Sequence, residues 1–117
     1  SLQQPAMRDH NDTRLSGNLT TDPRPFTTDT GEGCEFSLAV ADQWRDKDKI
    51  LQERTDFIGV VCYGPIRDRA MRLTKGDRVL LTGKLRNETV PKADGKAETK
   101  TKLRAATIET LRNIVLQ

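Results

Sequence analysis

The chain has 117 residues, which is typical of one small domain, and 34% of them are hydrophobic and 32% charged. It has no run of about 18 apolar residues and begins with polar residues, so we expect no membrane span, no signal peptide and a cytoplasmic location. The net charge of +3 is unevenly divided, because residues 1–58 hold 7 Lys and Arg against 11 Asp and Glu, whereas residues 59–117 hold 13 against 6. Such an asymmetry can mark a surface for a polyanion, although surface charge also keeps a small domain soluble.

The first third of the chain predicts a polar arm followed by two strands. Residues 1–12 are irregular and are expected to form a flexible arm or an extension of the first strand. Gly17 lies inside the first strand, where a glycine can provide the sharp bend that a small barrel needs. Residues 22–25 hold two prolines, which lack the N–H donor of a strand ladder, and residues 27–33 are expected to be a loop. Strict alternation of apolar and other residues then predicts a strand at 34–41.

The rest of the chain predicts a charged connection, a strand, a short helix and a final hairpin. Residues 42–53 are either the polar tip of a β-hairpin or a flexible loop. Pro65 suits the first turn of a helix, and apolar residues recur at helical spacing until Gly76. Residues 88–98 contain Pro, Asp and Gly and are expected to be a solvated hairpin tip. The expected strands cover residues 13–21, 34–41, 54–63, 78–87 and 99–111.

This order of elements is typical of one fold class. Three short strands, a helix and two more strands favour an all-β, five-stranded Greek-key barrel of the OB type, in which closure removes exposed edges. The short helix would lie between the third and fourth strands. We expect this domain to cover residues 13–112 and residues 113–117 to be a C-terminal remnant.

The residues that catalysis or metal binding would need are scarce. His10 is the only histidine and lies in the expected arm, so no fixed pair of nucleophile and base is available. The chain has no Walker-type or dinucleotide-binding glycine motif. Cys34 and Cys62 lack CxxC spacing and are expected to be buried thiols. The sequence therefore predicts no enzymatic activity, no cofactor and no metal site.

Aromatic residues beside cations point to an unpaired nucleic-acid strand, because bases stack on rings and phosphates pair with cations. The only tryptophan, Trp44, stands next to Arg45 and near Lys47. A core tryptophan would have apolar neighbours, whereas those of Trp44 are polar or charged. Phe57 and Tyr63 share one face of their strand, and we expect this face to be the outer one. The alternative is that both rings pack against a neighbouring subunit.

Two rows of cations flank the final hairpin. Lys84 and Arg86 share one face of their strand, and Lys100, Lys102 and Arg104 share one face of the next. A single exposed cation is usually only solvated, but two rows on adjacent strands form a stripe that a phosphate chain could follow. Such binding weakens steeply with salt, because it depends on the release of counterions.

Seven short segments keep the order and spacing of a known family over nearly all of residues 13–112. They are Gly17-Asn18-Leu19 with Asp22-Pro23, Phe36-Ser37-Leu38-Ala39-Val40-Ala41, Trp44-Arg45-Asp46-Lys47, Glu53-Arg54-Thr55-Asp56-Phe57, Val60-Val61-Cys62-Tyr63-Gly64, Lys75-Gly76, and Val79 followed by Gly83-Lys84-Leu85-Arg86. In these segments the chain resembles the bacterial-type single-stranded DNA-binding proteins. The resemblance implies an OB fold that assembles as a homotetramer or dimer and binds single-stranded DNA without sequence preference, in replication, recombination and repair.

The resemblance also implies roles for single residues. Trp44, Phe57 and Tyr63 match family positions whose rings stack on bases. Lys47 and Arg86 match family cations that lie near the path of the DNA backbone.

The chain also departs from this family. Glu88 and Val90 occupy a hairpin where the family often has an aromatic residue, which predicts weaker binding per site. The acidic, aromatic-ended tail of the family is missing at residues 115–117, so the sequence is either truncated or a tailless paralogue, such as a phage or plasmid version. The alternative function is that of a tailless OB-fold protein-interaction subunit in a replication-restart or mobile-element complex, with weak affinity for DNA.

Overall fold

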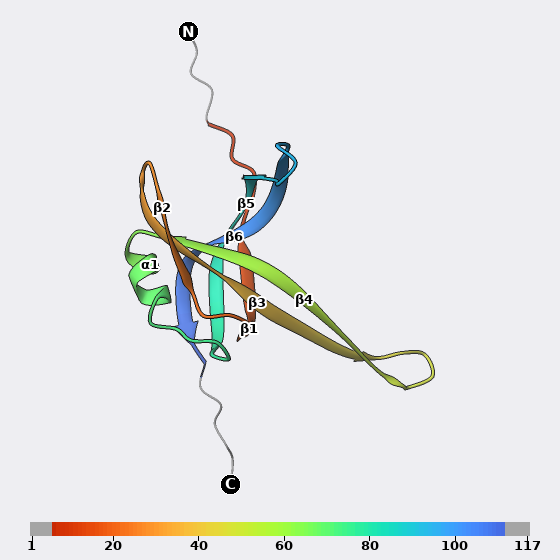
Figure 1. The fold of residues 1–117 in the computed structure, drawn as a ribbon. Coiled ribbons are helices and arrows are strands. Elements are labelled where there is room, and N and C mark those ends of the chain that lie inside the picture. The colour runs from red at the N-terminus through yellow and green to blue at the C-terminus, as the bar shows by residue number, and fades with distance from the viewer. Residues whose placement is uncertain (1–5, 112–117) are drawn as a thin grey trace.

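In the computed structural model, which describes residues 6–111, six strands form a single sheet closed into a barrel, and one short helix packs against it (Figure 1). The elements are β1 (Thr13–Leu19), β2 (Arg24–Thr28), β3 (Gly31–Arg45), β4 (Leu51–Tyr63), α1 (Pro65–Ala70), β5 (Arg78–Pro91) and β6 (Ala97–Thr110). The strand order is β1-β5-β6-β4-β3-β2, and β1 also pairs with β3, so five strands close and β2 remains as an additional edge. The expected class, a five-stranded barrel with a short helix between its third and fourth strands, is confirmed.

Strand β2 is the element that the sequence failed to predict. The prolines of residues 22–25 were expected to end all pairing, yet Pro25 lies in β2 opposite Cys34 of β3. A missing N–H donor is tolerated there because β2 has a partner on one side only, and edge strands accept proline. The expected loop at residues 27–33 is therefore wrong, since most of it belongs to the β2–β3 hairpin.

The two other hairpins are longer than expected. Strands β3 and β4 stay paired as far as Arg45 and Leu51, which makes residues 42–53 a β-hairpin rather than a flexible loop. This hairpin projects beyond the barrel as an arm (Figure 1). Strands β5 and β6 likewise stay paired as far as Pro91 and Ala97, so most of residues 88–98 are strand rather than tip.

One apolar core fills the barrel. Val60 and Cys62 of β4 are fully buried in it, and Ile58 packs against it, as the alternation along β4 predicted. The two cysteines are free and buried and lie opposite each other, and burial, followed by the nearby Cys34, raises the pKa of Cys62 to about 12. The buried residues of the core are Leu19, Cys34, Phe36, Leu38, Val60, Cys62, Ala70, Leu73, Val79, Leu81, Leu103, Ala105 and Ile108.

Gly17 allows β1 to close the barrel. Up to this residue β1 pairs with β5, and from Asn18 it also pairs with β3, opposite Ala39. A Cβ atom on Gly17 would overlap the backbone oxygen of Ala39, so the strands can approach only because glycine has no side chain. Gly17, where the bend was expected, therefore lies at the point where β1 begins to pair with β3 as well as with β5.

The N-terminal arm is attached to the barrel near its end. The Asn11 side-chain amide donates to the backbone oxygen of Leu85 and accepts from its N–H, at 3.0 and 2.9 Å, so it continues the β1–β5 ladder in place of a backbone. Residues 1–5 of the expected arm and the expected remnant, residues 113–117, lie outside the described residues. Within residues 6–111, the only helix has six residues, and it is not long and apolar enough to cross a membrane.

Candidate nucleic-acid interface

The β3–β4 hairpin carries two exposed rings. Phe57 is 68% exposed and Trp44 45% exposed, although neither lies in a loop. The pairing register sets Trp44 opposite Gln52 and Phe57 opposite Ala39. Because side chains alternate between faces along a strand, Trp44 continues the face of Leu38, whereas Phe57 lies on the opposite face. A ligand that contacts both rings must therefore pass around the hairpin.

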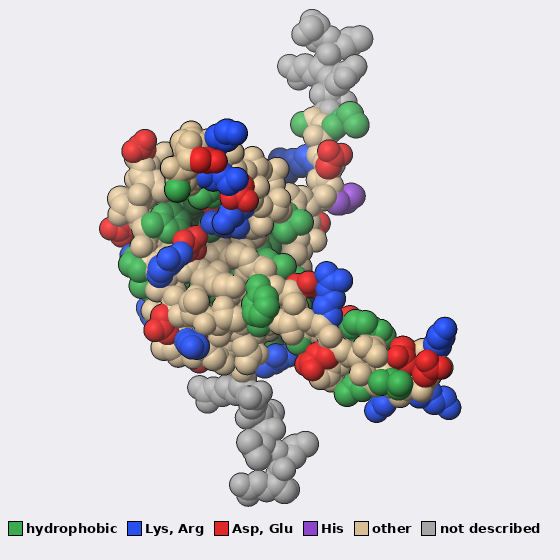
Figure 2. All heavy atoms as spheres, turned by 45° about the vertical axis from the view of Figure 1, so that its right-hand side comes forward, with side chains coloured by type: hydrophobic (Ala, Val, Ile, Leu, Met, Phe, Trp, Pro, Cys, Tyr) green, Lys and Arg blue, Asp and Glu red, His purple; other side chains and the backbone are tan. Residues whose placement is uncertain are grey.

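The tip of this hairpin is a tight turn organised by Asp46. Its carboxylate accepts hydrogen bonds from the backbone N–H groups of Asp48 and Ile50 and from the side chain of Gln52, at 2.8 to 3.0 Å. The Ile50 N–H is the main cause that holds the pKa of Asp46 below its ordinary value, against a smaller effect of desolvation. Arg45 donates to the backbone oxygen of Lys49 at 2.9 Å. Figure 2 shows hydrophobic, positive and negative side chains interspersed along this projecting arm.

The cations of the final hairpin lie on one face, as expected. The β5–β6 register sets Lys84 opposite Arg104, Arg86 opposite Lys102, and Glu88 opposite Lys100. Side chains directly opposite each other in an antiparallel pair are neighbours on the same face. The two rows therefore form one stripe, and Glu88 is the acidic residue within it.

Tyr63 is more enclosed than the two rings of the β3–β4 hairpin. The guanidinium of Arg104 lies 4.8 Å from the centre of its ring, and the ring of Phe26 meets it edge-on with the centroids 5.7 Å apart. Burial, and next the Glu88 carboxylate, raise the pKa of the Tyr63 hydroxyl. Arg104 thus already makes a cation–π contact with the ring on which a base was expected to stack.

Tyr63 also lines an open groove between two hairpins. The β2–β3 hairpin forms one wall and the β5–β6 hairpin the other, and the volume between them is about 860 Å³. Its floor includes Val61, which is fully buried although it lies on the outer face of β4. The lining residues are Thr28, Thr30, Gly31, Glu32, Val61, Tyr63, Gly64, Arg86, Asn87, Glu88 and Arg104.

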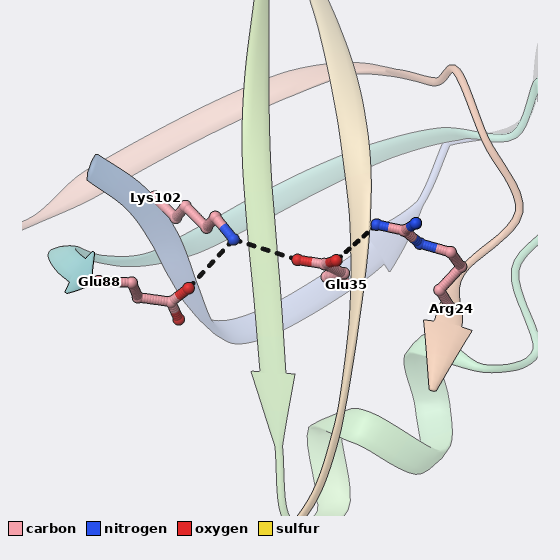
Figure 3. A network of polar contacts seen from close by, with 4 residues as sticks. All are labelled: Arg24, Glu35, Glu88 and Lys102. Atoms are coloured by element: carbon pink, nitrogen blue, oxygen red, sulfur yellow. Dashed lines mark hydrogen bonds and ion pairs between the residues drawn. The ribbon is translucent and has the colours of Figure 1, made fainter. Parts of the chain in front are cut away.

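Lys102 is held by two carboxylates and differs in this from the other cations of the stripe. Its Nζ lies 3.1 Å from Oε2 of Glu35 and 3.0 Å from Oε2 of Glu88, and Arg24 contacts the other oxygen of Glu35 at 2.6 Å (Figure 3). Neither Glu35 nor Arg24 was predicted as a site residue. Recognising them would have required the β2–β3 pairing that sets Arg24 opposite Glu35.

The expected site residues thus fall into two groups. Trp44, Arg45, Lys47 and Phe57 lie on the β3–β4 hairpin. The groove and stripe bring together Tyr63, Lys84, Arg86, Lys100, Lys102 and Arg104. In the part of the chain that the structure describes, no cluster of three or more His, Cys, Asp or Glu side chains could hold a metal ion.

Comparison with known proteins identifies the family. The profile of the Single-strand binding protein family matches residues 10–111. The chain belongs to this family. It is 29% identical over 102 residues to a single-stranded DNA-binding protein of Deinococcus radiodurans, covering 86% of this chain and 34% of the relative. It is 31% identical over 108 residues to single-stranded DNA-binding protein 2 of Chlorobaculum tepidum, covering 90% and 73%.

A solved structure supports the same fold for this member of the Single-strand binding protein family. The Plasmodium falciparum SSB, solved in complex with ssDNA, superimposes with a TM-score of 0.79 at 24% identity, covering 92% of this chain and all of that one. The chain spans about a third of the length of its Deinococcus relative, so the activities of such longer proteins do not transfer to it directly.

Proposed function

We propose that this protein binds single-stranded DNA without sequence preference and without catalysis. The observation that carries the proposal is that two rings, Trp44 and Phe57, are exposed on the β3–β4 hairpin, while the β5–β6 hairpin carries a stripe of cations. Unpaired bases stack on such rings whatever their sequence, while lysine and arginine neutralise the phosphates. Membership in the family and the names of the curated relatives support DNA as the ligand.

Each group of residues has its own task in this proposal. Trp44 and Phe57 stack bases on the two faces of the β3–β4 hairpin, with Arg45 and Lys47 near the phosphates. Tyr63 offers a third, partly occupied ring in the groove. The stripe of Lys84, Arg86, Lys100, Lys102 and Arg104 follows the DNA backbone.

The broader setting is also part of the proposal. The protein would act as a homo-oligomer, a tetramer or a dimer, in the cytoplasm, in replication, recombination and repair. Light scattering with and without a defined oligo-dT measures the oligomeric state.

The decisive experiment is a titration of the protein with oligo-dT at low salt, monitored through the fluorescence of its only tryptophan. We expect quenching, because Trp44 would stack on a base, and a progressive loss of binding as salt is added. A duplex of the same length and oligo-rU test the preference for an unpaired strand and for DNA. An unchanged Trp44 spectrum at saturating oligo-dT would contradict the proposed role of this ring.

Three observations favour the second candidate, an OB-fold subunit that mainly binds protein. Lys102 is already neutralised, Tyr63 is covered by Arg104, and Val90 has no ring to offer. This alternative predicts weak binding of oligo-dT even at low salt, together with tight capture of a protein partner.

A further inference from the structure

Four charged side chains form a belt across the outer face of the sheet. Figure 3 shows them in sequence, each in contact with the next: Glu88 of β5, Lys102 of β6, Glu35 of β3 and Arg24 of β2. The belt crosses β4 at Gly59, because a Cβ atom there would lie 3.2 Å from Cγ of Lys102. Gly59 lies between Phe57 and Tyr63 on the same face of β4, so the belt separates these two rings.

Lys102 is tightly held in this belt. Its side chain is only 16% exposed, and its ammonium contacts both carboxylates. Burial alone would lower the pKa of Lys102, but Glu88 and then Glu35 outweigh it and raise that pKa. Burial would likewise raise the pKa of Glu35, but Lys102 and then Arg24 outweigh it and lower that pKa. Lys102 and Glu35 are therefore both charged near neutral pH.

The neighbouring cations are free by comparison. Lys84, Arg86 and Lys100 are exposed, and none of them makes an ion pair with another residue of the described part of the chain. Two acids and two cations make the belt neutral as a whole. It therefore interrupts the positive stripe at the place where a DNA strand would pass from the groove at Tyr63 to the exposed ring of Phe57.

We propose that Glu88 and Glu35 compete with DNA phosphate for the ammonium of Lys102 and thereby lower the affinity of this face. The inference rests on the proposed function, since it concerns how the same site is tuned. A phosphate can pair with Lys102 only when the ammonium gives up a carboxylate. Glu88 is the partner to be given up, because its only ion pair among the described residues is with Lys102, whereas Arg24 also holds Glu35 in place.

The competition has two measurable consequences. Neutralising Glu88 removes one of the two carboxylates that compete for the Lys102 ammonium, so binding becomes tighter, by roughly threefold if the competing pair is worth about 0.6 kcal/mol. The number of phosphates neutralised rises by about one, which steepens the salt dependence by about 0.7 for a single strand. Both consequences require Lys102.

The experiment compares Glu88→Gln with Glu98→Gln, each alone and in a Lys102→Gln background. Glu98 also lies on β6, four residues from Lys102 on the same face, but it is exposed and takes no part in the belt. The two substitutions change the net charge equally. Binding of labelled oligo-dT is measured by anisotropy at several salt concentrations, and thermal unfolding checks that each variant is folded.

We expect Glu88→Gln to bind about threefold more tightly than wild type and with a steeper salt dependence. Glu98→Gln should change binding less, and in the Lys102→Gln background the two variants should not differ. Weaker binding by Glu88→Gln, an equal gain from Glu98→Gln, or a gain that persists without Lys102 would each overturn the inference while leaving the proposed function intact. Absence of binding by wild type itself would overturn both.

Discussion

The β3–β4 hairpin and the β5–β6 face both combine rings with cations, but they differ in how many of these groups are free. On the β3–β4 hairpin, Trp44 and Phe57 are exposed. On the β5–β6 face, Arg104 covers the Tyr63 ring and two carboxylates hold Lys102. A group that already has a partner must lose that contact before it gains a new one, so its net contribution is smaller. The number of rings and cations is therefore a poor measure of binding strength.

The largest effect should come from the ring at the end of the arm. If Trp44 stacks on a base, Trp44→Ala should weaken oligo-dT binding by about 1–3 kcal/mol. Arg69→Ala is the control, because Arg69 is an exposed cation on α1, away from the arm. Anisotropy of labelled oligo-dT measures both variants without relying on tryptophan fluorescence. Equal losses would mean that charge alone holds the strand.

A direct comparison of Phe57 with Tyr63 tests whether a free ring contributes more than a covered one. Phe57→Leu and Tyr63→Leu both keep an apolar side chain and remove the ring. We expect Phe57→Leu to lose about 1 kcal/mol more of the binding free energy, since the Tyr63 ring already has Arg104 and Phe26 as partners. A larger loss for Tyr63→Leu in anisotropy titrations would indicate that Arg104 and Tyr63 act together as a stacking platform.

Adding a ring to the β5–β6 face should reduce the difference between the two regions. Val90 lies on the same face as Glu88, whereas Thr89 points to the other face of β5. Val90→Trp should tighten oligo-dT binding by about 1 kcal/mol, the lower end of the range for one stacked base. Thr89→Trp is the matched control and should have little effect. Unchanged affinity in Val90→Trp would mean that the strand does not reach the tip of this hairpin.

The barrel could be predicted well from the sequence, because the patterns that indicate its strands lie within short stretches of the chain. The alternation around Phe36 and the glycine at position 17 have a direct physical meaning, and both are found as expected. The exposure of Trp44 also followed from its polar neighbours, and that of Phe57 from the alternation of side chains between the two faces of its strand. Strand β2 was missed because two prolines rule out a central strand but not an edge strand.

The partners of the site residues could not be predicted in the same way. Lys102 and Glu35 are 67 residues apart, and they meet only because β6 runs beside β4 and because Gly59 leaves room for the lysine side chain. Arg104 reaches Tyr63 through the same juxtaposition. The sequence predicted that Lys102 and Arg104 share a face of one strand and that Tyr63 lies on the outer face of another, but the contacts among these residues and Glu35 depend on the parallel β4–β6 pairing.

The smallest effect is expected in a test of whether the belt stabilises the protein in the absence of DNA. The pKa of Glu35 lies below its ordinary value near 4.5 in the folded state. The unfolded chain therefore binds this proton more readily, so the contribution of Glu35 to stability is present above about pH 4.5 and is lost as the pH falls through the lowered pKa. Glu35→Gln should lower the free energy of unfolding at pH 7 by less than about 1 kcal/mol.

Urea unfolding followed by circular dichroism at pH 7 and at pH 3 checks the direction of this pH dependence of stability. The difference between wild type and Glu35→Gln should shrink toward acid pH, because protonation removes the same charge from the wild type. Glu98→Gln should show no such trend, since Glu98 has no ion pair among the described residues. A difference that is equal at both pH values would mean that the shape of the Glu35 side chain matters rather than its charge. The two regions would then differ in packing rather than in their charges.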